Sequence, residues 1–182
     1  MTDIEKLISW LNLFSISSGK EFTLSSGETS TVYIDVKKTV LHHRCHKLVA
    51  KLLWDKMLGE FRRHGVIQSV AGVALGGCHL ASIVAMYAPC DLDVVYVRNA
   101  PKNHGTENLL ERPHMFRDQQ IVLIEDVVTT GKSSSLAAQA LEKEGYDVLG
   151  IISVVDRRTV KNNFIANQWP FAALVNIEQL TV

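Results

Sequence analysis

Residues 122–134 read VLIEDVVTTGKSS, an apolar run that ends in two acids and continues into a turn rich in hydroxyl groups. Its last letters match the end of the nucleotide-binding P-loop, G-x-x-x-x-G-K-[ST]. Counting back from Gly131, however, places Asp126 at the position of the first glycine. A carboxylate there repels a polyphosphate, and a residue with a Cβ atom disfavours that tight turn. The sequence therefore excludes a P-loop.

Two acids beside a phosphate cradle instead indicate a ligand with two chemically different faces. Carboxylates accept hydrogen bonds from sugar hydroxyls, and magnesium prefers oxygen ligands, so a phosphorylated sugar with bound magnesium fits. We predict a strand over 122–125, a loop over 126–131 and a helix from Lys132 to a stop at Gly145. The amides and hydroxyls of residues 129–133 would then bind a monophosphate at the helix N-terminus.

Around this stretch, short runs rich in valine and isoleucine alternate with segments of helical or loop character. These runs are VIQSVAGVAL at 66–75, LDVVYV at 92–97, QIVLIEDVV at 120–128 and VLGIISVVD at 148–156. Buried parallel strands joined by crossover helices have this pattern. We therefore predict an α/β fold, a parallel sheet flanked by helices, with its ligand site beyond the carboxyl ends of the strands.

The remaining segments carry weaker patterns. Apolar residues recur with helical spacing in 3–14 and in 43–64. Segments 22–24 and 31–36 are predicted to be extended, with a turn between them. The run WPFAALV at 169–175 fits either a late strand or an interface element, and the sequence leaves both open.

Two further loops fall at the predicted ligand edge of the sheet. In GVALGGC, residues 72–78, the glycine pair would let the backbone approach a ligand closely, although an ordinary turn into a helix is an equal alternative. Segment 98–116, RNAPKNHGTENLLERPHMF, is long for a loop inside a compact domain. Its Arg98, Lys102 and His104 could clamp a diphosphate and cover the reaction from water. The alternative is a solvated loop without a specific role.

Composition sets broad limits on the class of protein. At 182 residues the chain has the size of one domain, and nineteen basic and nineteen acidic residues give a formal charge of zero, which argues against non-specific nucleic-acid binding. Cys45, Cys78 and Cys90 are odd in number and irregularly spaced, which suits a reducing compartment better than a disulfide framework. With neither a leader pattern nor eighteen consecutive apolar residues, we predict a cytoplasmic protein without a membrane segment.

Two smaller motifs have competing interpretations. His42, Cys45 and His46 stand at i, i+3 and i+4 and could share a metal ion, but without a second ligand pair a solvated helix start is favoured over a zinc site. Lys37 and Lys38 could steer anionic substrates, although a surface lysine pair usually has no specific role.

EDVVTTGKS at 125–133 resembles the phosphoribosyl-diphosphate signature of type I phosphoribosyltransferases. Three more pieces are similar to orotate phosphoribosyltransferases, namely FTLSSGETSTVYID at 22–35, RNAPKNHGTENLLE at 98–111 and VVDRR at 154–158. They occur in family order and span positions from about 22 to 158. The resemblance implies one phosphoribosyltransferase domain, 1–182, with a small N-terminal hood segment over about 1–40 and a core over about 41–182.

The resemblance also implies roles for individual residues. Catalysis would fall to Lys102, His104 and Asp126. The substrate-binding residues would be Tyr33, Gly76, Gly77, Arg98, Glu125, Val127, Val128, Thr129, Thr130, Gly131, Lys132, Ser133 and Arg157. In the family, the acid pair contacts ribose hydroxyls, the turn after it holds the 5-phosphate, and the arginine matched by Arg157 binds orotate, with the segment matched by 26–34 covering the base. The implied cofactor is Mg²⁺, held through the diphosphate donor with no certain protein ligand, and the implied partners are phosphoribosyl diphosphate, orotate and a second copy that shares its active site.

The chain departs from the family at three positions. Asn99, Gly76 and Ser25 stand where many members have lysine, which lowers the positive charge around the diphosphate. Two alternatives remain, a phosphoribosyltransferase for another base and a non-catalytic sensor of phosphoribosyl diphosphate. Arg157 argues against a neutral base, because the orotate carboxylate needs a cationic partner. Residues that act on a leaving group, in the segment 98–116, favour an enzyme over a sensor.

Overall fold

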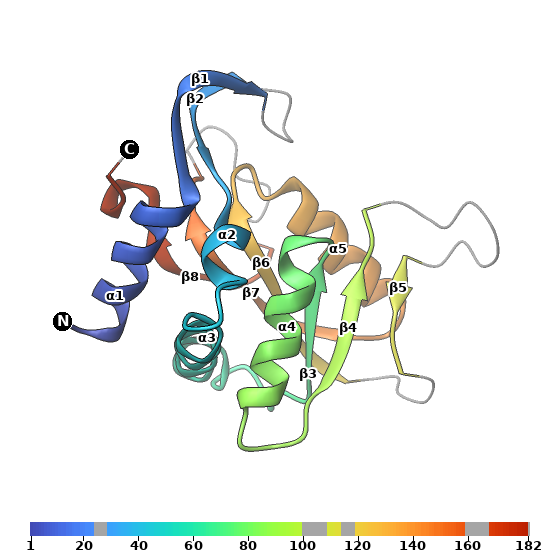
Figure 1. The fold of residues 1–182 in the computed structure, drawn as a ribbon. Coiled ribbons are helices and arrows are strands. Elements are labelled where there is room, and N and C mark those ends of the chain that lie inside the picture. Colours follow the sequence, from blue (N-terminus) through green and yellow to red (C-terminus); the bar gives the residue numbers. More distant parts are fainter. Residues whose placement is uncertain (24–28, 100–108, 114–118, 159–167, 182) are drawn as a thin grey trace.

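The computed structural model describes residues 1–23, 29–99, 109–113, 119–158 and 168–181, and its centre is a six-stranded sheet in the order β5-β4-β3-β6-β7-β8 (Figure 1). The strands are β3 (Ser69–Val73), β4 (Asp93–Val97), β5 (Leu110–Glu111), β6 (Gln120–Val128), β7 (Asp147–Asp156) and β8 (Phe171–Asn176). Every neighbouring pair is parallel except β4 and β5. The predicted α/β fold around a parallel sheet is confirmed.

Helices cover both faces of this sheet (Figure 1). They are α1 (Asp3–Trp10), the π-helix η1 (Leu11–Ser15), α2 (Val36–Val40), α3 (His46–Phe61), α4 (Gly76–Tyr87), α5 (Lys132–Lys143) and the 3₁₀ helix η2 (Ile177–Gln179). Val122 and Ile124 of β6 belong to the core cluster under α1, α3 and α4, whereas Ile121 and Leu123 belong to the cluster under α5. Burial on both faces explains why the central strands read as continuous apolar runs.

An antiparallel ribbon precedes the sheet. It consists of β1 (Ile16–Thr23) and β2 (Thr29–Ile34), and it stands at the end of the molecule toward which β3 and β4 point (Figure 1). Arg157, just after β7, donates from Nη1 to the carbonyl oxygen of Val32 at 3.5 Å. The ribbon therefore lies at the edge of the sheet where a ligand site is expected, as the predicted hood segment requires.

Several boundaries differ from the sequence prediction. The extended segment predicted for 31–36 ends at Ile34, because Val36 starts α2, whose burial against the core outweighs the strand preference of its valines. The helix predicted for 43–64 covers only His46–Phe61, and the strand predicted for 66–75 covers only Ser69–Val73. Strand β8 settles the choice left open for 169–175, and β5 lies inside the predicted long loop.

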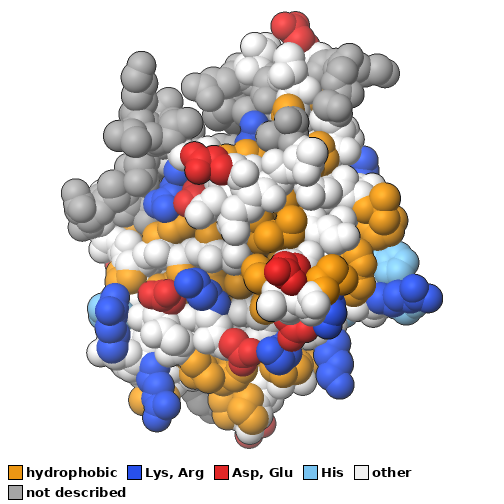
Figure 2. Space-filling view, turned by 90° about the vertical axis from the view of Figure 1, so that its left-hand side faces the viewer, with side chains coloured by type: hydrophobic (Ala, Val, Ile, Leu, Met, Phe, Trp, Pro, Cys, Tyr) orange, Lys and Arg blue, Asp and Glu red, His pale blue; other side chains and the backbone are white. Residues whose placement is uncertain are grey.

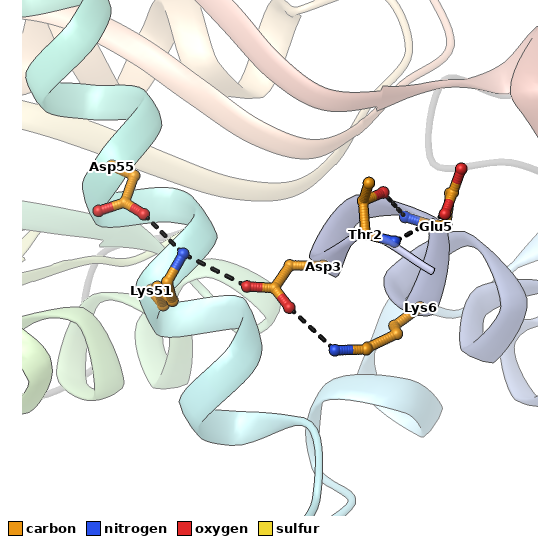
Figure 3. Close-up of polar contacts among 6 residues, drawn as sticks. All are labelled: Thr2, Asp3, Glu5, Lys6, Lys51 and Asp55. Carbon is orange, nitrogen blue, oxygen red and sulfur yellow. Dashed lines mark hydrogen bonds and ion pairs between the residues drawn. The ribbon is translucent and has the colours of Figure 1, made fainter.

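Ion pairs join the first helix to α3 (Figure 3). Thr2 and Glu5 form a capping box at the N-terminus of α1, which satisfies backbone donors of its first turn. Asp3 bonds to Lys6 at 3.1 Å and to Lys51 of α3 at 3.3 Å. These side chains keep 35 to 43 % of their surface exposed, so the ion pairs contribute little and apolar packing contributes most of the stability of this contact.

The first helices also meet the far end of the described chain. Leu7 and Leu11 are buried in the same core cluster as Val175 and Leu180. The side chain of Asn12 accepts a hydrogen bond from the Thr181 amide at 2.9 Å. Residues that are about 170 positions apart therefore pack as neighbours.

The surface on the side of α1 and α3 carries both signs of charge. Figure 2 shows basic and acidic side chains interspersed with small apolar patches on this face, in line with the formal charge of zero. Among the described residues, no helix has both the length and the apolar character needed to cross a bilayer.

Candidate active site

The turn between β6 and α5 has the geometry of an anion cradle. Gly131 is the N-cap of α5 with a φ of 77°, a left-handed conformation that glycine adopts without strain. Gly131 supplies no capping side chain, so in the described part of the chain the amides that follow Lys132 in the first turn can donate to a ligand. The hydroxyl of Thr130 already accepts from the amide of Lys132 at 3.3 Å. The turn can therefore hold a phosphate group.

A cavity of about 460 Å³ opens beside this turn at the carboxyl ends of β3 and β6. It is lined by Lys37, Val73, Ala74, Leu75, Gly76, Asn99, Glu125, Asp126, Val127, Val128, Thr129, Thr130, Gly131, Lys132, Ser133 and Ser134. The acids, the cradle and the loop before α4 thus face one space. Most of the predicted substrate-binding residues line it together.

The two acids have different environments. Glu125 is only 6 % exposed, and this burial, together with the charge of Asp126, raises its pKa to about 8. The Ser134 hydroxyl donates to Glu125 Oε1 at 3.1 Å, and this hydrogen bond acts in the opposite direction and lowers the pKa. Asp126 is fixed at one oxygen by the Val127 amide, 2.8 Å away, and its other oxygen lies 3.7 Å from Lys37 Nζ. Without ligand, Glu125 is thus mostly protonated at neutral pH and can donate or accept a hydrogen bond.

The glycine pair lets α4 approach β6 closely. A Cβ atom at Gly77 would overlap with the carbonyl oxygen of Ile124, and one at Gly76 would overlap with the carboxylate of Asp126. The pair is therefore more than an ordinary turn into a helix. It brings the loop before α4 against the acid pair, whereas close approach of this backbone to a ligand stays a prediction.

The residues predicted to form a lid are only partly described. Arg98 follows β4, and its Nε bonds to Glu111 of β5 at 2.8 Å while its amide donates to the Leu109 carbonyl. Asn99 lines the cavity, but Arg98 is outside its lining. Lys102 and His104 lie outside the described residues, so their predicted roles stay predictions.

The residues predicted to bind the base lie together, next to the cavity lining rather than within it. Arg157 donates its amide to Val128 and its guanidinium to Val32, beside Tyr33. Burial lowers the pKa of the Arg157 guanidinium from its usual range. Tyr33 stacks on Phe22 with ring centroids 5.4 Å apart. The hood and the end of β7 thus form one wall beside the cradle.

The structure differs from the sequence prediction at two residues of the cavity wall. The sequence predicts at most a steering role for Lys37, yet Lys37 lines the cavity, and Ser134 lines it beyond the predicted cradle. A lysine in a short polar run carries no local signal of such a position. At the possible zinc motif, His42 stacks on His43, and in the described parts of the chain no three His, Cys, Asp or Glu side chains gather closely enough to hold a metal ion.

A family model for the phosphoribosyl transferase domain matches residues 38–165, which include the acid pair, the cradle and the loop before α4. The chain belongs to the phosphoribosyl transferase family. It is 39 % identical to orotate phosphoribosyltransferase of Thermococcus kodakarensis over 87 % of this chain and 83 % of that protein. It is 30 % identical to the Mycobacterium avium enzyme of the same name over 98 % and 96 % of the two chains. The crystal structure of Mycobacterium tuberculosis orotate phosphoribosyltransferase with Fe(III) dicitrate aligns over both whole chains, with 26 % identity and a TM-score of 0.80.

Proposed function

We propose that this protein is an orotate phosphoribosyltransferase of pyrimidine nucleotide synthesis. It transfers ribose 5-phosphate from phosphoribosyl diphosphate to orotate, which yields orotidine 5-monophosphate and diphosphate. The observation that carries the proposal is the single cavity in which the cradle, the acid pair and the loop 73–76 face one another. The names of the relatives from Thermococcus and Mycobacterium support orotate as the acceptor.

The chemistry follows from the charges that develop during transfer. The bond between the anomeric carbon and a diphosphate oxygen breaks, its electron pair leaves with the diphosphate, and a ring nitrogen of orotate bonds to that carbon. The turn 129–133 holds the 5-phosphate, and Glu125 and Asp126 bind the ribose hydroxyls, so the sugar is fixed for attack. Cationic groups, among them Lys102 and His104, stabilise the leaving diphosphate. As the new bond forms, the ring nitrogen of orotate loses its proton, and water or an oxygen of the leaving diphosphate accepts it, so no strong protein base is required.

Mg²⁺ is the proposed cofactor, and the cavity fits it. The carboxylates of Glu125 and Asp126 supply oxygen atoms of the type that Mg²⁺ binds. Because the described residues hold no cluster of three or more metal-binding side chains, the ion would bind largely through the donor itself. When bound, Mg²⁺ neutralises charge on the diphosphate.

We further propose a cytoplasmic, single-domain protein that forms a homodimer, in which Arg98, Lys102 and His104 reach the neighbouring site. Leu75, at the cavity, and Met86, on α4, are 75 % and 87 % exposed and supply apolar surface for such a contact. The three cysteines carry free thiols, as a reducing compartment allows.

The proposal is tested by following the ultraviolet absorbance of orotate with purified protein, phosphoribosyl diphosphate and Mg²⁺. Loss of the orotate signal, with formation of its nucleotide, is expected only when Mg²⁺ is present. If orotate is unchanged while the donor with Mg²⁺ raises the melting temperature, the donor site stands and orotate as acceptor is wrong.

In the same assay, Lys102→Ala is expected to lower kcat at least about tenfold, because it removes a cation from the leaving group. The melting temperature should stay within about 2 °C, since the sequence predicts Lys102 in a loop, where a side chain adds little to stability. Lys47→Ala on the exposed side of α3 is the matched control and should leave kcat unchanged. Normal turnover of Lys102→Ala would remove its catalytic assignment.

A further inference from the structure

Lys37 is a half-buried cation on the wall of the cavity, and the proposed reaction so far gives it no role. Its Nζ bonds to Asp35 at 2.8 Å and lies 3.7 Å from Asp126 Oδ2. Burial works against the ammonium, but the hydrogen bond to Asp35 and the charges of both acids outweigh it and raise the pKa of Lys37. The side chain is therefore charged at any pH at which the protein would work.

Its place in the cavity is next to the loop before α4. The Asp126 carboxylate that Lys37 faces also fills the space above Gly76, where a Cβ atom would overlap with it. Lys37 thus lies beside Asp126, in the part of the cavity where the acid pair, which would bind ribose, meets the loop 73–76, which would line the diphosphate. Of the described residues that line the cavity, only Lys37 and Lys132 have cationic side chains. Lys132 lies at the opposite, cradle end.

The fold of α2 does not depend on this side chain. Val36, Thr39 and Val40 are buried and anchor the helix in the core. The hydroxyl of Thr39 donates to the carbonyl of Trp10 at 3.1 Å and lies 2.6 Å from the hydroxyl of Ser15. The Asp35 oxygen that Lys37 reaches is buried, so loss of the ammonium also costs some stability. Binding measurements on two different ligands therefore have to separate a requirement of the ligand from a requirement of the fold.

We propose that Lys37 is a further catalytic residue, whose ammonium binds the leaving diphosphate. This inference rests on the proposed function. Within that function, it makes Lys37 the cation for the part of the cavity that holds the diphosphate. Asp35 holds the ammonium in place, and the N–H group of Nζ that points to neither Asp35 nor Asp126 can donate to a diphosphate oxygen. A charge-assisted hydrogen bond of this kind strengthens as the diphosphate gains negative charge in the transition state.

The test compares Lys37→Gln with Lys38→Gln, an exposed lysine on the same helix. Calorimetry measures the Kd of inorganic diphosphate and, separately, of ribose 5-phosphate, both with Mg²⁺. We expect Lys37→Gln to weaken diphosphate binding about tenfold or more, to change ribose 5-phosphate binding less than about twofold, and to lower kcat. Lys38→Gln should match the wild type, and Lys37→Arg should recover part of the diphosphate affinity.

Unchanged diphosphate binding in Lys37→Gln would overturn the inference. Equal weakening of both ligands would also overturn it, because it would mean that Lys37 only orients Asp126. If wild-type protein binds diphosphate through Lys37 but forms no orotidine 5-monophosphate, the proposed function fails while the diphosphate contact stands.

Discussion

Gly77→Ala is expected to lower the free energy of unfolding by about 3 kcal/mol, toward the upper end of overpacking effects. The added methyl group would overlap with the backbone carbonyl of Ile124, which cannot rotate away as a side chain can. Helix α4 must then move off β6, and the loop 73–76 moves with it. Because that loop and the acid pair line one cavity, the donor should also raise the melting temperature less than it does in the wild type.

Urea unfolding and donor-dependent melting measure both effects. Gly59→Ala is the matched control, since a Cβ atom at Gly59 in α3 meets nothing within 4 Å. It should stabilise the protein by about 0.5 to 1 kcal/mol, the usual preference for alanine over glycine in a helix. A Gly77→Ala protein as stable as the wild type would show that the close approach of α4 to β6 is not required.

Glu125→Gln is expected to remove a pH dependence of stability in the ligand-free protein. Burial and the charge of Asp126 raise the pKa of Glu125 from 4.5 to about 8, so the folded state binds this proton more tightly than the unfolded chain does. The stabilising effect of this proton is complete below about pH 4.5 and is lost as pH rises through about 8. The loss is at most about 5 kcal/mol, from 1.36 kcal/mol for each pKa unit between 4.5 and about 8.

Melting temperatures from pH 5 to 9 measure this effect. Glutamine keeps an oxygen acceptor for the Ser134 hydroxyl, so Glu125→Gln should match the wild type near pH 5 and exceed it by about 10 °C at pH 8.5. Glu60→Gln is the control, because it removes a partly exposed acid paired with Lys56. Its melting temperature should depend on pH as that of the wild type does. Parallel curves for wild type and Glu125→Gln would show that Glu125 is ionised throughout this range.

The centre of the fold could be predicted because its signals are local. Strand β6 contains the predicted strand 122–125 but continues to Val128, three residues into the predicted loop, because Val127 and Val128 still pair with β7. The helix predicted from Lys132 is α5, which ends before Gly145 with its φ of 91°. Buried apolar runs and a glycine stop identify such elements without knowledge of their partners. The cradle and the acid pair follow directly from this strand and helix, so their meeting at one cavity could be anticipated.

Other features depend on contacts between distant residues. Strand β5 has two residues, too few for a periodic pattern, and exists because Leu110 and Glu111 pair with β4. Helix α2 has five residues and is fixed by burial rather than by helix propensity. Lys37 gains its position from α2 and its neighbour Asp126 from β6, about ninety positions later. The sequence around Lys37 or around Asp126 therefore does not predict their contact.

The contact of the first helices with Leu180 and Thr181 limits the order in which the chain can fold during its synthesis. During synthesis, Leu7 and Leu11 emerge about 170 residues before Val175 and Leu180, which complete their burial. Strands β3, β6 and β7 can pair before that, whereas α1 keeps its apolar face exposed until β8 and the segment after it are available. Helix α1 is therefore translated before the sheet but completes its packing after it, and termination just before Leu180 should yield chains that chaperones retain.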